Sequence, residues 1–119
     1  MQFMLMCCSE SEHWSSLPES ERDQVMRDYE QWVRDQVASG HYLAGGKLDE
    51  SHTASTLREM DGRMKVTDGP FSEAKEQIGG YHLIECRDRA EAIAIARKIP
   101  TLRVGSSVEV RPLLYQNVE

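Results

Sequence analysis

The chain has 119 residues, 29% of them charged, and a formal net charge of −6. This length suits one ordinary core, so we expect residues 1–119 to form a single domain. The acidic net charge argues against direct binding to nucleic acid or to a membrane. No apolar run reaches the ~20 residues that a membrane span needs, and residues 1–10 lack signal-peptide features. These observations together predict a cytoplasmic protein.

The chain opens with a strand and a long helix. Residues 1–7, MQFMLMC, form a nearly continuous apolar run that is typical of a strand covered on both faces. Residues 15–40 follow as an amphipathic helix, with Ser16 or Ser20 as its cap and Gly40 at its end. Apolar residues at helical spacing define the buried stripe of this helix: Val25, Tyr29, Trp32, Val33 and Val37.

The middle of the chain predicts a strand and a hairpin. Residues 41–48, HYLAGGKL, form a strand in which Gly45-Gly46 favours a bulge or a close backbone approach. Residues 53–60 and 63–68 flank Asp61-Gly62, the dipeptide that favours a tight primed turn. We therefore expect a two-stranded hairpin after the second strand.

The last third predicts a strand, a helix and a final strand. Residues 79–86 form the strand, and residues 87–100 form a helix that Asp88 and Glu91 cap at its start. Pro100 ends this helix, and residues 106–114 form the last strand. The expected apolar stripe of the helix consists of Ala92, Ile93, Ala96 and Ile99.

This order of elements predicts an α+β fold of the ferredoxin-like split βαβ type, with an antiparallel sheet and an extra hairpin. Two helices cover only one face of such a sheet, whereas several strands are apolar on both sides. The simplest layer that could cover the second face is another copy of the chain, related by two-fold symmetry. We therefore expect a homodimer.

Residues 66–85, VTDGPFSEAKEQIGGYHLIE, carry a likeness to a known family. Together with FMLM, AGGKL, STLRE and the closing ARKIP…SSVEVRPL, this stretch resembles the DGPF-domain branch of the YCII-related family, over residues 2–114. The resemblance implies a dimeric α+β barrel whose biochemical activity is not defined. It also implies a regulatory link to extracytoplasmic-function sigma factors, beside which some members are encoded.

The broader family has been proposed to use a His-Asp pair as an enzymatic site. The positions that would carry it contain Tyr29 and no histidine in the first-helix region, and Ile99 before Pro100. We therefore do not assign the family's His-Asp pair to this chain. No Ser-His-Asp order, phosphate-binding glycine loop or zinc signature is present either.

Asp68 and His82 are the candidate catalytic residues. Asp68 either shapes the turn before Gly69-Pro70 or acts as a carboxylate at a cleft mouth. His82 shares a strand face with Ile84 and Cys86, so it lies under the helices if Ile84 does. If the faces are reversed, His82 points into the dimer barrel near Asp68 and transfers protons at neutral pH.

The candidate ligand-binding residues surround the same region. Phe71 is either a plug under the loop or a stacking platform, and Lys75 is either a solvated side chain or an anion partner. Charged residues on the apolar strands suggest an ion network around a hydrated cavity, because unpaired buried charge is costly. Its members would be Arg58, Glu85, Glu109 and Arg111, and the alternative is that these charges lie on a solvated sheet edge. Tyr81 completes the candidate set.

Cysteine and histidine usage argues against a disulfide framework and a metal site. The three cysteines are an odd number, and Cys7 and Cys8 are neighbours whose side chains point to opposite faces of a strand. The four histidines show no metal-ligand spacing. We expect no metal and no cofactor.

Three functional hypotheses remain. The first is a homodimer that binds a small molecule in its barrel and serves regulation beside a sigma factor. The second is a cofactor-independent isomerase, lyase or oxygenase that uses Asp68 and His82 for proton transfer. The third is a partner-binding module whose acidic first helix, with Glu19, Glu21 and Asp23, meets a basic protein surface.

Overall fold

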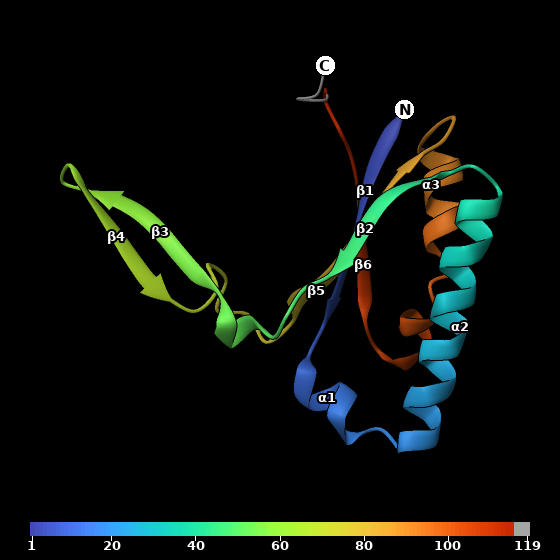
Figure 1. Ribbon diagram of the computed structural model, residues 1–119, viewed down its shortest axis with the longest axis horizontal. Helices are drawn as coiled ribbons and strands as arrows, with labels where there is room; N and C mark the ends of the chain where they lie inside the picture. Colours follow the sequence, from blue (N-terminus) through green and yellow to red (C-terminus); the bar gives the residue numbers. More distant parts are fainter. Residues whose placement is uncertain (116–119) are drawn as a thin grey trace.

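The computed structural model describes residues 1–115 and shows helices packed on one face of an antiparallel sheet (Figure 1). The four strands lie in the order β2-β5-β1-β6. Their bounds are β1 (Gln2–Ser9), β2 (Tyr42–Lys47), β5 (Gln77–Glu85) and β6 (Ser107–Pro112). A separate two-stranded hairpin contains β3 (Ser55–Met60) and β4 (Arg63–Asp68). The helices are α1 (Ser11–Ser16), α2 (Glu19–Ala38) and α3 (Arg89–Ala96), with 3₁₀ turns η1 (Ser51–Thr53) and η2 (Pro100–Val104).

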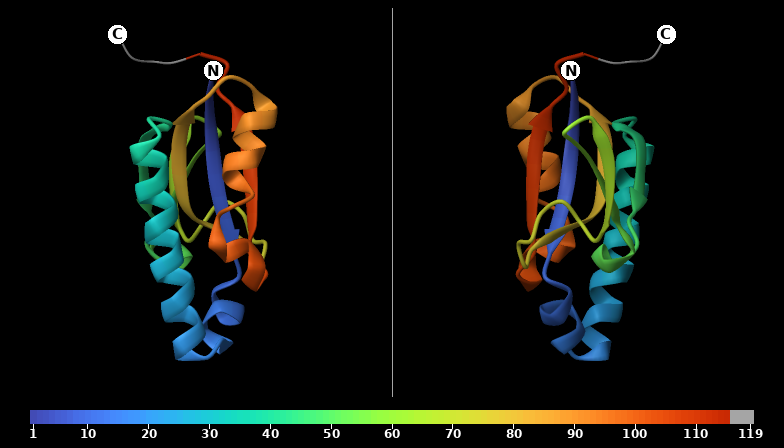
Figure 2. Two further views of the ribbon diagram at one scale, coloured as in Figure 1. Left: turned by 90° about the vertical axis from the view of Figure 1, so that its right-hand side faces the viewer. Right: turned by 90° about the vertical axis from the view of Figure 1, so that its left-hand side faces the viewer.

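The strand order confirms the ferredoxin-like α+β fold. Strand β1 lies at the centre and pairs antiparallel with β5, so that Phe3 faces Ile84, and with β6, so that Leu5 faces Val110. Strand β2 pairs with the other edge of β5. The two helices that follow β1 and β5 lie on the same face of this sheet (Figure 2). Among residues 1–115, no helix has the length and apolarity that a membrane crossing needs.

Helix α2 ends where we expected but begins differently. Gly40 has a φ of 83° and follows the last helical turn, a left-handed conformation that glycine adopts without steric cost. The N-cap is Pro18, with no side-chain hydrogen bond, so neither predicted serine caps the helix. Ser16 instead ends the short, unpredicted helix α1. Val37 is exposed, which corrects its assignment to the buried stripe.

Helix α3 begins at the predicted cap. The Asp88 carboxylate accepts a hydrogen bond of 2.9 Å from the backbone N–H of Glu91, which satisfies a donor that the first turn leaves free. The apolar stripe is rotated from the expected one: Ile95 is buried, whereas Ile93 is exposed. The helix ends at Ala96, before Pro100, which begins η2.

The core lies between the helices and one face of the sheet. Alternation along each strand decides which side chains enter it, because successive residues point to opposite faces. The largest fully buried side chains are Phe3, Leu5, Val25, Ile84 and Ile99. Burying each side chain of this kind contributes about 1.5–3 kcal/mol. Trp32 joins them, and its Nε1–H donates a 3.0 Å hydrogen bond to the Ile95 carbonyl, linking α2 to α3.

Among residues 1–115, no helix lies over the opposite face of the sheet. Met4, Met6, Tyr81 and Leu83 alternate with the core residues on the two central strands and are half-buried. The helices lie on the other side of the sheet (Figure 1). This uncovered surface, formed by Met4, Met6, Tyr81 and Leu83, is called the open face below.

The hairpin projects from the sheet on the side away from the helices (Figure 1). Its turn confirms the prediction from Asp61-Gly62, since both residues have positive φ values, 52° and 76°, as a primed turn requires. The register gives the hairpin two unlike faces. One face carries Leu57, Met64 and Val66, called the apolar row below, and the other carries Thr56, Arg58, Lys65 and Thr67.

Candidate functional site

The DGPF segment forms the turn that follows β4. Gly69 has a φ of 103°, a conformation that side chains rarely adopt, and its N–H donates a 2.7 Å hydrogen bond to the Ala54 carbonyl. The Thr56 hydroxyl donates to the Gly69 carbonyl at 2.7 Å. These two hydrogen bonds hold the turn against the first residues of the hairpin, and they set the direction in which Pro70 and Phe71 leave it.

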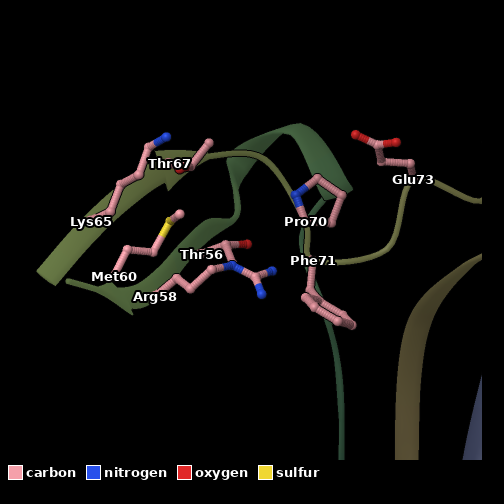
Figure 3. Close-up of a pocket in the computed structure, with 8 residues that line it drawn as sticks. All are labelled: Thr56, Arg58, Met60, Lys65, Thr67, Pro70, Phe71 and Glu73. Carbon is pink, nitrogen blue, oxygen red and sulfur yellow. The ribbon is translucent and has the colours of Figure 1, made fainter.

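A cleft of about 190 Å³ lies between the hairpin and this turn. Figure 3 shows its lining side chains, which come from the polar face of the hairpin on one side and from the DGPF segment on the other. The lining residues are Thr56, Arg58, Met60, Lys65, Thr67, Pro70, Phe71 and Glu73. The predicted ligand-binding residues Arg58 and Phe71 are therefore brought together.

Arg58 and Phe71 make a direct contact in the cleft. The guanidinium carbon of Arg58 lies 5.4 Å from the centre of the Phe71 ring, within the range of a cation–π interaction. Phe71 is 76% exposed, so it is not the buried plug that one interpretation of the sequence expected. Its ring forms an accessible wall of the cleft.

Asp68 is next to this cleft in sequence but does not line it. Residues 64, 66 and 68 of β4 share one face, so Asp68 lies with Val66 on the side opposite Lys65 and Thr67. Its Cα partner on β3 is Ser55. The turn is held by Gly69 and Thr56, and we find no Asp68 side-chain hydrogen bond among residues 1–115 that would support its predicted role in shaping the turn.

His82 lies under helix α2, surrounded by aromatic rings. It is 4% exposed, and its ring centre is 5.0 Å from that of Trp32. The Tyr42 hydroxyl lies 2.9 Å from Nδ1, and the Tyr29 hydroxyl is hydrogen-bonded to Nε2. The strand-face alternative that puts His82 with Ile84 beneath the helices is therefore the correct one.

The buried position determines the charge state of this aromatic cluster. Burial lowers the pKa of His82 to about 4 and raises the pKa of the Tyr29 hydroxyl, because each charged form loses its hydration. Burial also raises the pKa of the Cys7 thiol, whose sulfur lies 3.6 Å from the Tyr29 hydroxyl. The cluster is neutral at pH 7, and a protonated thiol is a poor nucleophile. It joins α2, β1, β2 and β5 through hydrogen bonds.

The predicted proton-transfer pair is not assembled among residues 1–115. His82 faces α2, whereas Asp68 is exposed on the hairpin, which projects from the other side of the sheet (Figure 1). Both nitrogens of His82 already have tyrosine partners. This arrangement corrects the expectation that His82 and Asp68 point into one cavity.

The other predicted site residues are dispersed. Tyr81 lies on the open face and Glu85 is exposed at the end of β5. Lys75 is exposed in the loop before β5 and does not line the cleft. Among residues 1–115 the expected four-residue ion network is not formed: Arg111 pairs with Glu109 at 2.5 Å on β6, and Arg58 lies on the hairpin beside Phe71.

Several contributing residues were missed by sequence reasoning. Tyr42, the Nδ1 partner of His82, lies next to a bulge that shifts the register between Tyr42 and Ala44. Thr56, Lys65 and Thr67 line the cleft because of the hairpin register. Counting residues in alternation on both sides of the Asp61-Gly62 turn would have predicted that Thr56, Lys65 and Thr67 share one face of the hairpin. Among residues 1–115, no group of three His, Cys, Asp or Glu side chains is arranged to hold a metal ion.

The strand order, the helix layer and the projecting hairpin define a ferredoxin-like α+β protein. The family model of the YCII-related domain matches residues 1–114, so the chain belongs to the YCII-related family. It is 36% identical over 118 residues to "Uncharacterized protein R00369" of Rhizobium meliloti (strain 1021). The matched region covers 98% of this chain and 95% of that relative. The assignment to the YCII-related family is thereby confirmed, whereas the assignment to its DGPF-domain branch stays a prediction.

Proposed function

We propose that the protein is a homodimer in which the open faces of two sheets meet and enclose a site for a small molecule. The observation that carries this proposal is the open face itself. Met4, Met6, Tyr81 and Leu83 form a contiguous, largely apolar surface over the centre of the sheet, without a helix to cover it. Sheets with two apolar faces need a covering layer on each side.

The hairpin supports a second copy of the chain as the covering layer. Its apolar row is strongly exposed, with Val66 at 61%, and it projects on the same side of the sheet as the open face. An isolated two-stranded hairpin is only marginally stable in water. A partner related by two-fold symmetry would cover the apolar row and the open face together, because each copy supplies both surfaces.

The charges on the open face support a hydrated interior. Glu109 and Arg111 on β6 point to the same side as Met4 and Met6, since Met4 faces Arg111 and Met6 faces Glu109. The two side chains form an ion pair, so their enclosure leaves no unpaired charge. A cavity between two such faces would suit a small polar molecule.

The dimer is tested by light scattering coupled to gel filtration at micromolar concentration. We expect twice the mass of the chain for the wild type and for Thr67→Glu, and a shift toward the single-chain mass for Val66→Glu. Val66 and Thr67 are adjacent on β4 but point to opposite faces of the hairpin. A monomeric wild type, or equal masses for both variants, would contradict the proposed arrangement.

The small-molecule function is tested by native mass spectrometry of the freshly purified protein. We expect an additional mass on the dimer that denaturation removes. A dimer that carries no additional mass after purification from several growth media would count against a ligand. The alternative of an enzyme using Asp68 and His82 is not favoured by any contact described above.

Regulation beside a sigma factor is proposed on the strength of the family resemblance. The acidic start of α2 offers a surface for a basic partner, because Glu19, Glu21 and Asp23 are all exposed. Pull-down of a co-encoded sigma factor should weaken when these three positions are changed to lysine. Reversing Glu30 and Asp35, exposed on the same helix, is the control for reversing Glu19 and Glu21 alone, because both double variants change the charge equally. An equal effect of both sets would indicate general charge attraction.

A further inference from the structure

The polar face of the hairpin carries three basic side chains. Arg58 and Lys65 are direct Cα partners on β3 and β4, and Arg63 lies one step farther along the same face. Like charges directly opposite each other destabilise a two-stranded ribbon. No ion pair found among residues 1–115 includes any of these three side chains. This face is cationic in a chain with a net charge of −6, and Glu73 is the one acidic side chain among the residues that line the cleft beside Arg58 and Lys65.

An aromatic wall completes this cationic cleft. Phe71 follows the Gly69-Pro70 turn and presents its ring at the edge of the cleft, where the Arg58 guanidinium lies over it (Figure 3). Thr56 and Thr67, a second cross-strand pair, supply hydroxyl groups on the same face. A volume of about 190 Å³ is small for a ligand site, so it suits a compact molecule.

We propose that this cleft binds a small organic anion, whose carboxylate lies between Arg58 and Lys65 and whose flat apolar part lies on Phe71. This cleft is a second site, apart from the space between the open faces, so the inference goes beyond the proposed function. A carboxylate would remove the repulsion between the two cations and accept charge-assisted hydrogen bonds from them. Because one protomer supplies every lining residue, the cleft does not depend on the dimer.

Glu73 sets a limit on the charge of the ligand. Its carboxylate is the one acidic side chain among the residues that line the cleft, and it lies beyond Pro70 (Figure 3). A second negative charge on the ligand would be repelled there, whereas a hydroxyl or amine would find an acceptor. The cleft therefore favours a monoanion over a polyanion such as a nucleotide.

The class of ligand is tested by titrating the ¹⁵N-labelled protein with benzoate and with benzamide at constant ionic strength. Benzamide keeps the ring and the planar shape but has no charge. We expect benzoate to shift the amide signals of Thr56, Thr67 and Phe71, and benzamide to bind at least about threefold more weakly, as the loss of an exposed charge interaction predicts. Equal binding of the two probes would overturn the proposal.

One lysine variant and one arginine variant distinguish specific binding in the cleft from general electrostatic attraction. Lys65→Gln should weaken benzoate binding by about threefold to tenfold, because it removes a cation that lines the cleft. Arg63→Gln removes the same charge from the same strand and face but outside the cleft, and it should leave benzoate affinity unchanged. Equal weakening by both variants would overturn the assignment to this cleft.

Measuring the mass of the same samples distinguishes failure of this inference from failure of the proposed function. A dimer that retains an endogenous ligand but shows no benzoate shifts would overturn the inference and leave the function standing. A monomer with benzoate shifts at Thr56 and Phe71 would overturn the dimer and support the cleft. Phe71→Leu, which keeps an apolar side chain but no ring, should weaken benzoate more than it weakens acetate.

Discussion

The hydroxyl of Tyr42 lies 2.9 Å from Nδ1 of His82, while the hydroxyl of Tyr29 bonds Nε2 of the same ring. A neutral imidazole has one donor and one acceptor nitrogen, so the two tyrosines must play opposite roles. One tyrosine donates to the ring and the other accepts from it. A buried histidine is thus satisfied on both sides by residues from α2 and β2.

Acid should destabilise the protein through His82. The pKa of this group falls from about 6.5 in the unfolded chain to about 4 in the folded state because burial disfavours the charged ring. Between these values the unfolded chain binds more protons, so the free energy of unfolding should fall by up to about 1.4 kcal/mol per pH unit as the pH decreases. Urea unfolding between pH 4 and pH 7 measures this slope.

Replacing the histidine isolates its contribution to the slope. His82→Gln should flatten the pH dependence of the free energy of unfolding in this window, even though the variant is less stable at pH 7. His52→Gln provides the control, since His52 is exposed on η1. An unchanged slope in the His82 variant would show that another group causes the acid sensitivity.

The two tyrosine partners should differ in their effect on stability. Tyr29→Phe leaves a ring nitrogen without a partner beneath α2, and a buried unsatisfied polar group costs about 1–3 kcal/mol. Tyr42→Phe should cost less, because β2 is an edge strand and solvent has access to its side. The double variant should cost less than the sum of the single ones, since both act on one ring. Thermal or urea unfolding of all four proteins provides the comparison.

Gly45 and Gly46 should respond differently to alanine. A Cβ atom at Gly45 would lie 2.0 Å from the Tyr42 hydroxyl and 2.7 Å from Nδ1 of His82, so Gly45→Ala must displace this hydrogen bond. Overpacking of this kind costs about 1–3 kcal/mol. A Cβ atom at Gly46 would meet Tyr81 at 3.4 Å, an ordinary contact. Equal urea midpoints for the two variants would contradict the close approach at Gly45.

The cap of α3 gives a further prediction. Asp88→Ala should lower the free energy of unfolding by about 1 kcal/mol, because the N–H of Glu91 loses its acceptor. Asp88→Ser keeps a side-chain oxygen at the same position and should restore most of this loss. If serine and alanine were equally destabilising, the carboxylate would act through its charge and not through capping.

Local sequence signals predicted most of the fold. The hairpin turn and the end of α2 were predicted from Asp61-Gly62 and Gly40, residues that adopt positive φ angles there. The start of α3 was predicted from Asp88, whose side chain accepts the capping hydrogen bond. The rotation of α3 was missed, because Ile93 and Ile95 are equally apolar in the sequence and only packing buries Ile95. Helix α1 has six residues and no buried side chain, so it left no apolar period to detect.

The candidate site was predicted only in part. Arg58 and Phe71 were both predicted as ligand-binding residues, but Lys65 was not. Its place opposite Arg58 depends on the strand register, and a register shift of one residue would put Lys65 on the other face of the hairpin. The face that His82 occupies depends on where Ile84 packs, a tertiary property that strand alternation alone does not contain. Its partners Tyr29 and Tyr42 are separated from it by 53 and 40 residues.

The central position of β1 has a consequence for synthesis of the chain. Its two neighbours in the sheet come from the last third of the sequence: Gln2 pairs with Glu85, and Phe3 pairs with Pro112. Strand β1 is therefore made before both of its neighbours, and Phe3 and Leu5 stay uncovered until β5 and β6 have been added. Such long-range pairing slows folding and leaves an apolar strand unpaired while the rest of the chain is made.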